Sequence, residues 1–222
     1  MNVLILDYKC GNIGCIKNIF SYLNNQVTTI PIKNFPEINQ DDFDIVVLPG
    51  VGNFQHASKY LHENLNFQKF KEWLSLNKKV ICICLGFQLL FEESEESDNK
   101  SNKYPGIGII PGKITSLSGT DKLSLNIGWS ESKFFNKKNQ NNSLKAFLNN
   151  HYFYHMHSFG LEYEFIKDEI DFDWFTIAKH RYSKKAYVSS FKFNQYFGFQ
   201  FHPEKSGNNG LLLLKNIIEN AT

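Results

Sequence analysis

Residues 80–92 are Val-Ile-Cys-Ile-Cys-Leu-Gly-Phe-Gln-Leu-Leu-Phe-Glu, and this stretch is the strongest indication of the fold. An apolar run that ends at Cys84 predicts a buried strand, and the residues from Phe87 onward predict a helix. A cysteine in the sharp turn between strand and helix has the arrangement of a nucleophile elbow. The positive end of the helix dipole favours thiolate over thiol, and Gly86 suits a crowded turn. The stretch therefore predicts a reactive Cys84, although a cysteine taken alone is more often a small buried apolar residue.

A second motif lies far along the chain, in Gln200-Phe201-His202-Pro203-Glu204. Alternate residues of an extended chain project to the same side, so Glu204 can reach the imidazole of His202. A base and the group that orients it, placed beside a thiol, are the parts of cysteine-dependent acyl transfer. We therefore predict that Cys84, His202 and Glu204 are catalytic.

A loop with two glycines, Pro49-Gly50-Val51-Gly52, follows another apolar run. The carboxyl ends of parallel strands meet at one edge of an open α/β sheet, which is where such sheets bind ligands. Backbone N–H groups in a glycine loop can approach a substrate closely. We expect an N–H of Val51 or Gly52 to act with the Leu85 amide as oxyanion donors. Without Cys84, the loop would be interpreted equally well as a plain tight turn.

The first half of the chain alternates between strand and helix patterns. Strands are expected at 3–6, 27–32, 44–48 and 80–84, of which 3–6 and 80–84 are continuous apolar runs, and helices are expected at 13–23, 54–64 and 67–76. Uniformly apolar strands joined by helices are typical of a buried parallel sheet. This half therefore predicts four parallel strands with covering helices.

The second half changes character after the polar stretch 94–103, which is typical of a surface loop. Strands are expected at 108–117, 123–129, 152–157, 175–179, 186–192 and 196–201, an exposed loop at 136–142, and a last helix at 211–218. We interpret these strands as a partly antiparallel extension of the same sheet. The sequence thus predicts an α/β fold with one open mixed sheet, a parallel core flanked by helices and an antiparallel extension, in a single domain over residues 1–222.

The composition is typical of an intracellular enzyme. The 222 residues are 42% hydrophobic and carry a formal net charge of +2, enough for a substantial core and without a basic stripe for nucleic acid. No segment approaches the roughly 18 apolar residues of a membrane span, and the apolar run at the start is too short for a signal peptide. Cysteines 10, 15, 82 and 84 form two close pairs unlike a disulfide framework or a zinc site. We expect a cytoplasmic protein with no metal, no membrane association and no nucleic-acid partner.

Taken together, these residues resemble the class I (triad) glutamine amidotransferases over nearly the whole chain. Within that family the chain is most similar to the glutaminase subunits of imidazole glycerol phosphate synthases. The resemblance rests on motifs that occur in the family's order: Asp7-Tyr8, Gly11-Asn12, residues 49–54, 84–92 and 94–96, Gly106-Ile107-Gly108, Gly128-Trp129, residues 157–159 and residues 200–207. So many separate matches in order are highly specific.

The resemblance implies hydrolysis of glutamine through a thioester on Cys84, with His202 passing the proton to departing ammonia and Glu204 orienting His202. It implies further that glutamine is held by residues near the elbow and its two loops: Gly52, Leu85, Gln88, Glu96, Ser158 and Phe159. No cofactor is implied. Ammonia would pass, shielded from water, to a heterodimer partner, a (β/α)₈-barrel synthase that makes imidazole glycerol phosphate and aminoimidazole carboxamide ribotide in histidine biosynthesis.

Several positions depart from the family pattern. Cys82 stands where glycine is usual, Leu125-Asn126 where Pro-His is common, His155 where an aromatic residue is usual, and Phe159 in place of tyrosine. These departures leave two alternatives open: the same chemistry feeding a sugar amidotransferase of surface glycans, and a non-catalytic regulatory or scaffolding subunit. The complete set of Cys84, His202 and Glu204 argues against the second. A peptidase with the same three residues is disfavoured, because Gln88 and Glu96 match a pocket for a small amide.

Overall fold

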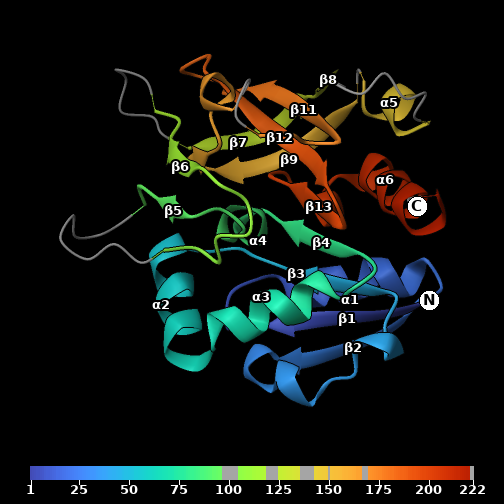
Figure 1. Ribbon diagram of the computed structural model, residues 1–222. Helices are drawn as coiled ribbons and strands as arrows, with labels where there is room; N and C mark the ends of the chain where they lie inside the picture. Colours follow the sequence, from blue (N-terminus) through green and yellow to red (C-terminus); the bar gives the residue numbers. More distant parts are fainter. Residues whose placement is uncertain (97–104, 119–124, 136–142, 150, 167–169, 221–222) are drawn as a thin grey trace.

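An eight-stranded mixed sheet forms the centre of the protein (Figure 1). The structure is a computed structural model that describes residues 1–96, 105–118, 125–135, 143–149, 151–166 and 170–220. The strands follow one another across the sheet in the order β2 (Gln26–Pro31), β1 (Asn2–Asp7), β3 (Ile45–Leu48), β4 (Val80–Ile83), β13 (Tyr196–Phe199), β12 (Ala186–Phe193), β11 (Trp174–Lys179) and β8 (Lys133–Phe135). The first five are parallel and the last three pair antiparallel. The predicted α/β sheet with a parallel core and an antiparallel extension is confirmed.

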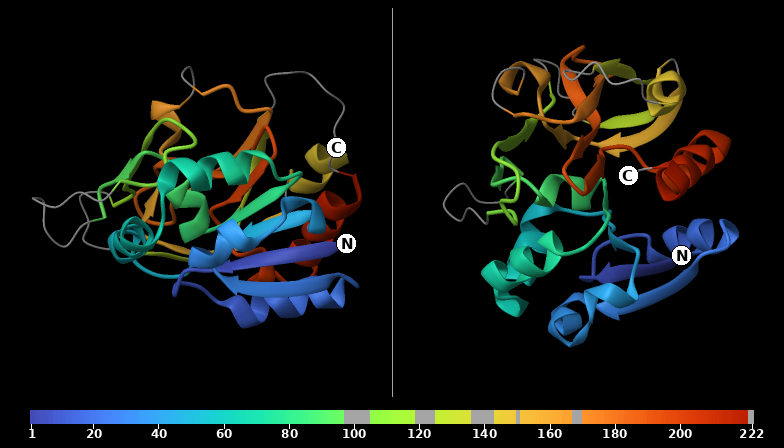
Figure 2. Two further views of the ribbon diagram at one scale, coloured as in Figure 1. Left: turned by 60° about the horizontal axis from the view of Figure 1, so that its bottom comes forward. Right: turned by 45° about the vertical axis from the view of Figure 1, so that its right-hand side comes forward.

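Helices cover both faces of this sheet, because alternate strand residues point to opposite sides. On β1, Leu4 and Leu6 belong to the core beneath α2 (Phe54–Asn64), α3 (Phe67–Ser75) and α4 (Leu85–Leu89). Val3 and Ile5 belong to the core beneath α1 (Ile13–Tyr22) and α6 (Gly207–Asn220). Figure 2 shows α2 and α3 on one side of the sheet and α1 and α6 on the other.

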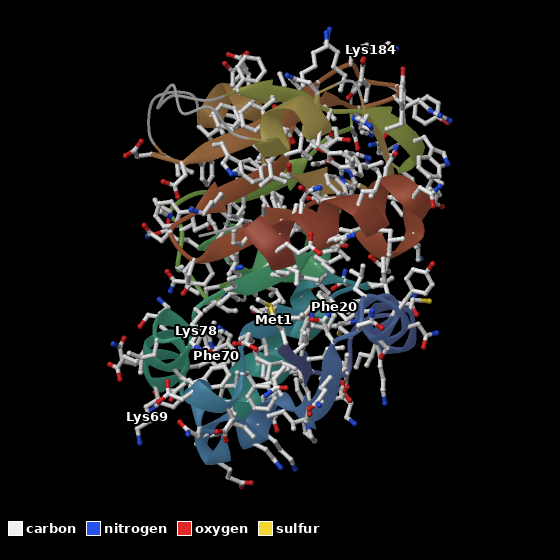
Figure 3. All side chains as sticks on the ribbon, turned by 90° about the vertical axis from the view of Figure 1, so that its right-hand side faces the viewer. Met1, Phe20, Lys69, Phe70, Lys78 and Lys184 are labelled. Atoms are coloured by element: carbon white, nitrogen blue, oxygen red, sulfur yellow. The ribbon has the colours of Figure 1, made fainter. Side chains whose placement is uncertain are left out.

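Helices α2 and α3 begin at asparagine caps, which explains their predicted boundaries. The Asn53 side chain accepts a hydrogen bond from the N–H of His56, and the Asn66 side chain accepts one from Lys69. Within α3, Phe70 is buried and the neighbouring Lys69 is exposed. Figure 3 shows Phe70 directed into the molecule and Lys69 directed away from it.

Three predicted strands do not belong to the central sheet, so this part of the prediction was wrong. The strand expected at 108–117 is the shorter β6 (Lys113–Ser116), which pairs with β5 (Glu93–Ser94) and β10 (Phe159–Gly160) in a small sheet. The strands expected at 123–129 and 152–157 are β7 (Asn126–Glu131) and β9 (Tyr152–His157), which pair with each other. The edge beside β11 is already taken by β8, which the sequence pattern does not indicate.

Other boundaries also differ from the sequence pattern. Helix α6 begins at Gly207, four residues before the expected start at 211, and α5 (Ser143–Leu148) was not expected. Four short 3₁₀ helices were not expected either: η1 (Ile32–Glu37), η2 (Gln40–Asp42), η3 (Tyr163–Phe165) and η4 (Pro203–Lys205). The predicted loop at 136–142 and most of that at 94–103 lie outside the described residues, as do positions 123 and 124. In the part of the chain that the structure describes, every helix is too short or too polar to cross a bilayer.

Candidate active site

Cys84 occupies a strained turn between β4 and α4. Its backbone dihedrals are φ 48° and ψ −100°, an uncommon conformation for a residue with a side chain. The Cys84 N–H donates to the carbonyl oxygen of Phe199 on β13 at 2.7 Å, and its own carbonyl accepts from the N–H of Gln88 at 3.0 Å. Strain of this kind gathers at functional sites and persists only where the surroundings enforce it. The elbow predicted from the sequence is confirmed.

Two glycines allow the elbow to pack against the neighbouring loop. A Cβ atom at Gly86 would lie 2.1 Å from the carbonyl oxygen of Leu48. A Cβ atom at Gly50 would lie 2.4 Å from the Cβ of Leu85. Neither position has room for a side chain, so the turn after β3 and the turn after β4 form one tightly packed unit.

His202 and Glu204 meet as the sequence predicts. The Nδ1 atom of His202 lies 2.8 Å from Oε1 of Glu204, and both side chains are buried. The loop that carries them is tied to β9, because the N–H of His202 donates to the Tyr154 carbonyl at 2.8 Å. The Ser206 hydroxyl donates to the His202 carbonyl and accepts from the Tyr154 N–H. Glu204 therefore orients the imidazole, and the other two bonds fix the backbone that carries it.

The charge state of His202 depends on its two neighbours. Burial opposes the charged imidazolium, but Cys84 and Glu204 outweigh burial and raise the pKa of His202 to about 10. The buried Nε2 atom makes no hydrogen bond of normal geometry to any described residue. The raised pKa favours a protonated imidazole, and its Nε2 atom is available to a reacting group.

A small cavity of about 50 Å³ lies at the elbow and brings the predicted binding residues together. It is lined by Val51, Gly52, Cys84, Leu85, Gln88, Glu96, Met156, His157, Ser158 and Phe159. A larger cavity of about 1040 Å³ lies beside β5 and β6, but none of the predicted site residues lines it. The chemistry of the lining, rather than the size of the cavity, marks the candidate site.

The predicted glutamine-holding side chains have protein partners in this conformation. The Gln88 amide donates to the Phe159 carbonyl at 2.9 Å and to Oε1 of Gln200 at 3.2 Å. The Glu96 carboxylate accepts from the N–H of Phe54 at 2.8 Å, at the first residue of α2. A carboxylate is stabilised at a helix N-terminus, which fixes Glu96 at the rim of the cavity.

The predicted oxyanion donors are not all free. The Leu85 N–H donates to the Gly50 carbonyl at 3.4 Å, a long hydrogen bond. Val51 is half-buried, and Gly52 is exposed with φ 145°. Both line the cavity. Their role as oxyanion donors stays a prediction, and so does that of Leu85.

The departures from the family pattern fit their surroundings. Cys82 is fully buried in the core with the other small and apolar residues beneath the elbow. His155 is fully buried and packs its ring against the edges of Tyr187 and Phe201. Burial lowers the pKa of His155 to about 3, against the effect of its hydrogen bond with the Phe153 carbonyl, and the charge of His202 adds to the lowering. His155 is therefore neutral and packs as an aromatic ring does.

Asn126 also has a complete set of partners. Its amide donates to the Tyr187 hydroxyl at 2.9 Å and lies 3.4 Å from Nε2 of His157, while its oxygen accepts from the Arg181 N–H at 3.2 Å. Asn126 therefore links the β7–β9 pair to the loop after β11.

Three residues at the site were missed by the sequence reasoning. Met156 and His157 line the cavity, and the Met156 carbonyl lies 3.9 Å from the Cys84 sulfur. Gln200 donates toward that sulfur from 3.7 Å. A signal for Gln200 existed, because it stands two residues before His202 in an extended segment and so projects to the same side.

Among the described residues, no group of three or more His, Cys, Asp or Glu side chains is arranged to hold a metal ion. Cys10, Cys15, Cys82 and Cys84 are all free thiols.

Comparison with known sequences gives matches over nearly the full chain. A family profile described as "Glutamine amidotransferase class-I" matches residues 4–220. The chain is 36% identical to imidazole glycerol phosphate synthase subunit HisH of Pyrococcus furiosus, over 96% of each chain. It is 31% identical to the subunit of the same name in Helicobacter hepaticus, over 98% of each. A match of 28% identity covers 99% of this chain and 38% of imidazole glycerol phosphate synthase hisHF of Emericella nidulans.

Comparison with solved structures agrees on the fold. The structure of PurLQS from Thermotoga maritima aligns with a TM-score of 0.69 at 14% identity, covering 100% of this chain and 99% of that one. A glutamine amidotransferase from Thermotoga maritima aligns with a TM-score of 0.54 at 18% identity, covering 99% of this chain and 83% of that one. These similarities concern the fold alone.

Proposed function

The chain belongs to the class-I glutamine amidotransferase family, and from that premise we propose that it is the glutaminase subunit of an imidazole glycerol phosphate synthase. The observation that carries the proposal is the convergence of Cys84, His202 and Glu204 at an elbow beside a cavity lined by amide-recognising groups. The names of the relatives do not favour a sugar amidotransferase or a silent subunit.

The proposed reaction has two steps. The Cys84 sulfur attacks the side-chain carbonyl carbon of glutamine, and a C–S bond forms as His202 transfers its Nε2 proton to the departing nitrogen. Ammonia leaves when the C–N bond breaks, and a thioester remains. Water then attacks the thioester carbon as His202 takes a proton from it. The C–S bond breaks, glutamate leaves and the sulfur is regenerated.

Glutamine binding requires the site to open. The cavity at the elbow measures about 50 Å³, well below the roughly 300–1,000 Å³ that is typical of small-molecule pockets. We propose that residues 51–53 and the Ser158–Phe159 segment move apart, so that Glu96 binds the substrate's ammonium group and Gln88 binds its backbone.

Oxyanion stabilisation requires a local change in the same loop. The carbonyl that accepts from Leu85 belongs to the peptide that links Gly50 and Val51. Rotation of that peptide removes the carbonyl from Leu85 and brings the Val51 N–H toward the sulfur. Two N–H donors then face the oxyanion. Such a donor is typically worth about 10²–10³ in rate.

The surface suited to the barrel partner lies on the β7–β9 pair. Leu125, Ile127 and Trp129 alternate along the chain and are 44%, 42% and 47% exposed. Ile127 pairs with Met156 and Trp129 with Tyr154, so these side chains share one face. Because Met156 also lines the Cys84 cavity, the apolar stripe leads directly to the site where ammonia forms. We propose that a (β/α)₈-barrel subunit covers this stripe and receives ammonia there.

The hisHF protein supports a partner of this kind. This chain matches 38% of its length, so the rest of that protein has room for a second unit. We therefore propose that a synthase unit of this kind works together with the present chain.

The proposal is tested with the complex of this chain and its barrel subunit. Cys84→Ala should abolish synthesis of imidazole glycerol phosphate from glutamine, because no thioester can form. Synthesis from added ammonium salts should continue at the wild-type rate. Retained use of glutamine by the variant would refute the role of Cys84.

The docking surface is tested by Ile127→Glu, which places a charge in the centre of the apolar stripe. We expect the dissociation constant of the complex to rise at least about tenfold, measured by titration calorimetry. Tyr22→Glu is the matched control, since Tyr22 is 74% exposed on α1, away from β7. Equal affinities of the two variants would place the partner elsewhere.

A further inference from the structure

Gln200 lies directly behind the Cys84 sulfur, and the proposed reaction assigns it no step. It follows β13 by one residue, and its side chain is fully buried. Its backbone N–H donates to the Ser189 carbonyl at 2.9 Å, which ties it to β12. Gln200 therefore approaches the sulfur from the rigid centre of the sheet, on the same strand end that carries His202.

The hydrogen bonds of Gln200 determine which way its amide points. The Gln88 amide nitrogen donates to the Phe159 carbonyl and to Gln200, so the atom of Gln200 that faces Gln88 is an acceptor, Oε1. The amide nitrogen of Gln200 is then on the other side, 3.7 Å from the Cys84 sulfur. The opposite amide orientation would bring two amide nitrogens together at the Gln88 contact and is excluded.

A buried N–H donor at this distance stabilises charge on sulfur. His202 supplies the compensating positive charge from one side, and Gln200 supplies a neutral donor from another. Because the Gln200 amide is neutral, it fixes the position of the sulfur and does not take up the proton that His202 carries. The same amide contacts Gln88, a proposed ligand of the substrate, through its oxygen.

We propose that Gln200 is a positioning residue that holds the Cys84 sulfur as a thiolate in line for attack and couples it to Gln88 in the substrate pocket. This inference rests on the proposed function for the identity of the substrate. The ionisation of Cys84, however, can be measured with no substrate present.

The experiment measures the rate at which iodoacetamide alkylates Cys84 as a function of pH, with the modified cysteine identified by peptide mass mapping. Gln200→Glu keeps the shape and the acceptor for Gln88 but replaces the donor by a carboxylate oxygen. Gln200→Met keeps the approximate volume and has no donor. In both variants the midpoint of the alkylation profile should rise by about one pH unit or more, and more for Gln200→Glu.

Gln195→Glu is the matched control, because this half-buried glutamine donates to the Ser75 carbonyl at 3.1 Å and precedes β13, at the opposite end of the strand from Gln200. Its profile should match the wild type. If the profiles of Gln200→Met and Gln200→Glu also match the wild type, or if both shift downward, the positioning role is refuted. Should one variant fail to fold, as judged by circular dichroism, the other still decides the question.

Failure of this proposal is distinguishable from failure of the proposed function. If the alkylation profiles of both Gln200 variants are unshifted and Cys84→Ala loses glutaminase activity, the positioning role of Gln200 is refuted and the proposed reaction stands. A shifted profile in a protein that does not hydrolyse glutamine would keep the role of Gln200 and refute the substrate.

Discussion

The two turns that meet at the active site are packed very differently. The elbow turn and the start of its neighbour have no free space, since a Cβ at Gly86 or Gly50 would collide with backbone or side-chain atoms within 2.4 Å. Two residues further along, a Cβ at Gly52 would have no neighbour closer than 3.8 Å. Gly52 is required for its positive φ of 145° rather than for space. The Cys84 turn is thus fixed, and the part of the neighbouring loop that we propose to supply an oxyanion donor has room to change.

The base shares the rigidity of the nucleophile. His202 is held by Glu204, by the Tyr154 carbonyl and by Ser206, all at 2.7–2.9 Å. Under the proposed function, a fixed Cys84–His202 pair beside an adjustable donor loop would keep the reaction slow until the loop is reorganised. The predictions below test whether this division between fixed and adjustable parts is real.

The largest effect is expected for Gly86→Ala, which places a methyl group 2.1 Å from the Leu48 carbonyl oxygen. The three nearest atoms are all backbone atoms of Leu48 and Pro49, which cannot move aside as a flexible side chain can, so we expect a loss of about 3 kcal/mol or more in the free energy of unfolding. Urea denaturation followed by circular dichroism measures it. A loss below about 1 kcal/mol would show that the elbow is not tightly fixed.

The second effect concerns pH. The folded-state pKa of His202 is about 10, above the ordinary value of about 6.5. Its protonation therefore contributes stability that is fully present below about 6.5 and is lost as the pH rises through about 10. The unfolding free energy of the wild type should exceed that of His202→Gln by less above pH 10 than at neutral pH. A difference that stays constant over this range would contradict a protonated His202.

The third effect is expected for Gly52→Ala, which has room for its methyl group but a strained backbone. We expect a loss of about 1–2 kcal/mol in unfolding free energy, and a glutaminase rate lowered by about 10²-fold because the oxyanion donor is displaced. Stability comes from denaturation curves and the rate from ammonia release by the complex. Unchanged activity would show that Gly52 and its loop do not take part in the reaction.

The smallest effect is expected for Gly14→Ala, the control for both glycine substitutions. A Cβ at Gly14 would have no neighbour within 4 Å, and the residue lies inside α1. Alanine favours the helix over glycine by about 0.5–1 kcal/mol, so this variant should be slightly more stable and fully active. Destabilisation by Gly14→Ala would mean that glycine substitutions are harmful for reasons other than local packing.

The sequence predicts the parallel half of the fold, the turn at Cys84 and the contact between His202 and Glu204 well, because all three depend on short-range signals. Uniform apolar runs indicate β1, β3 and β4, and the turn at Cys84 follows from its own neighbours. Helix α6 shows where such signals mislead. Gly207 and Gly210 suggest a loop, yet both lie within the helix. Glycine is needed at position 210 because a Cβ there would lie 1.8 Å from the Pro203 carbonyl oxygen. That glycine permits close packing and does not end a helix.

Long-range pairing is what the sequence does not determine. The sequence patterns of β7 and β9 predict strands, but they do not show that these strands pair with each other outside the central sheet. The edge beside β11 is occupied by β8 instead. The contact between Gln200 and Cys84 joins positions 116 residues apart. Periodicity places Gln200 on the correct side of its strand, but only the assembled sheet brings its amide to the sulfur.

The most direct test of the account is covalent labelling of the assembled complex with a chloromethyl ketone analogue of glutamine, followed by peptide mass mapping. The analogue has the substrate's amino-acid end and an electrophilic carbon near the position of the amide. One adduct per chain, on Cys84 and blocked by excess glutamine, is the predicted result. An adduct on Cys10, Cys15 or Cys82 in its place, or none at all, would contradict the assignment of Cys84 as the nucleophile that attacks glutamine.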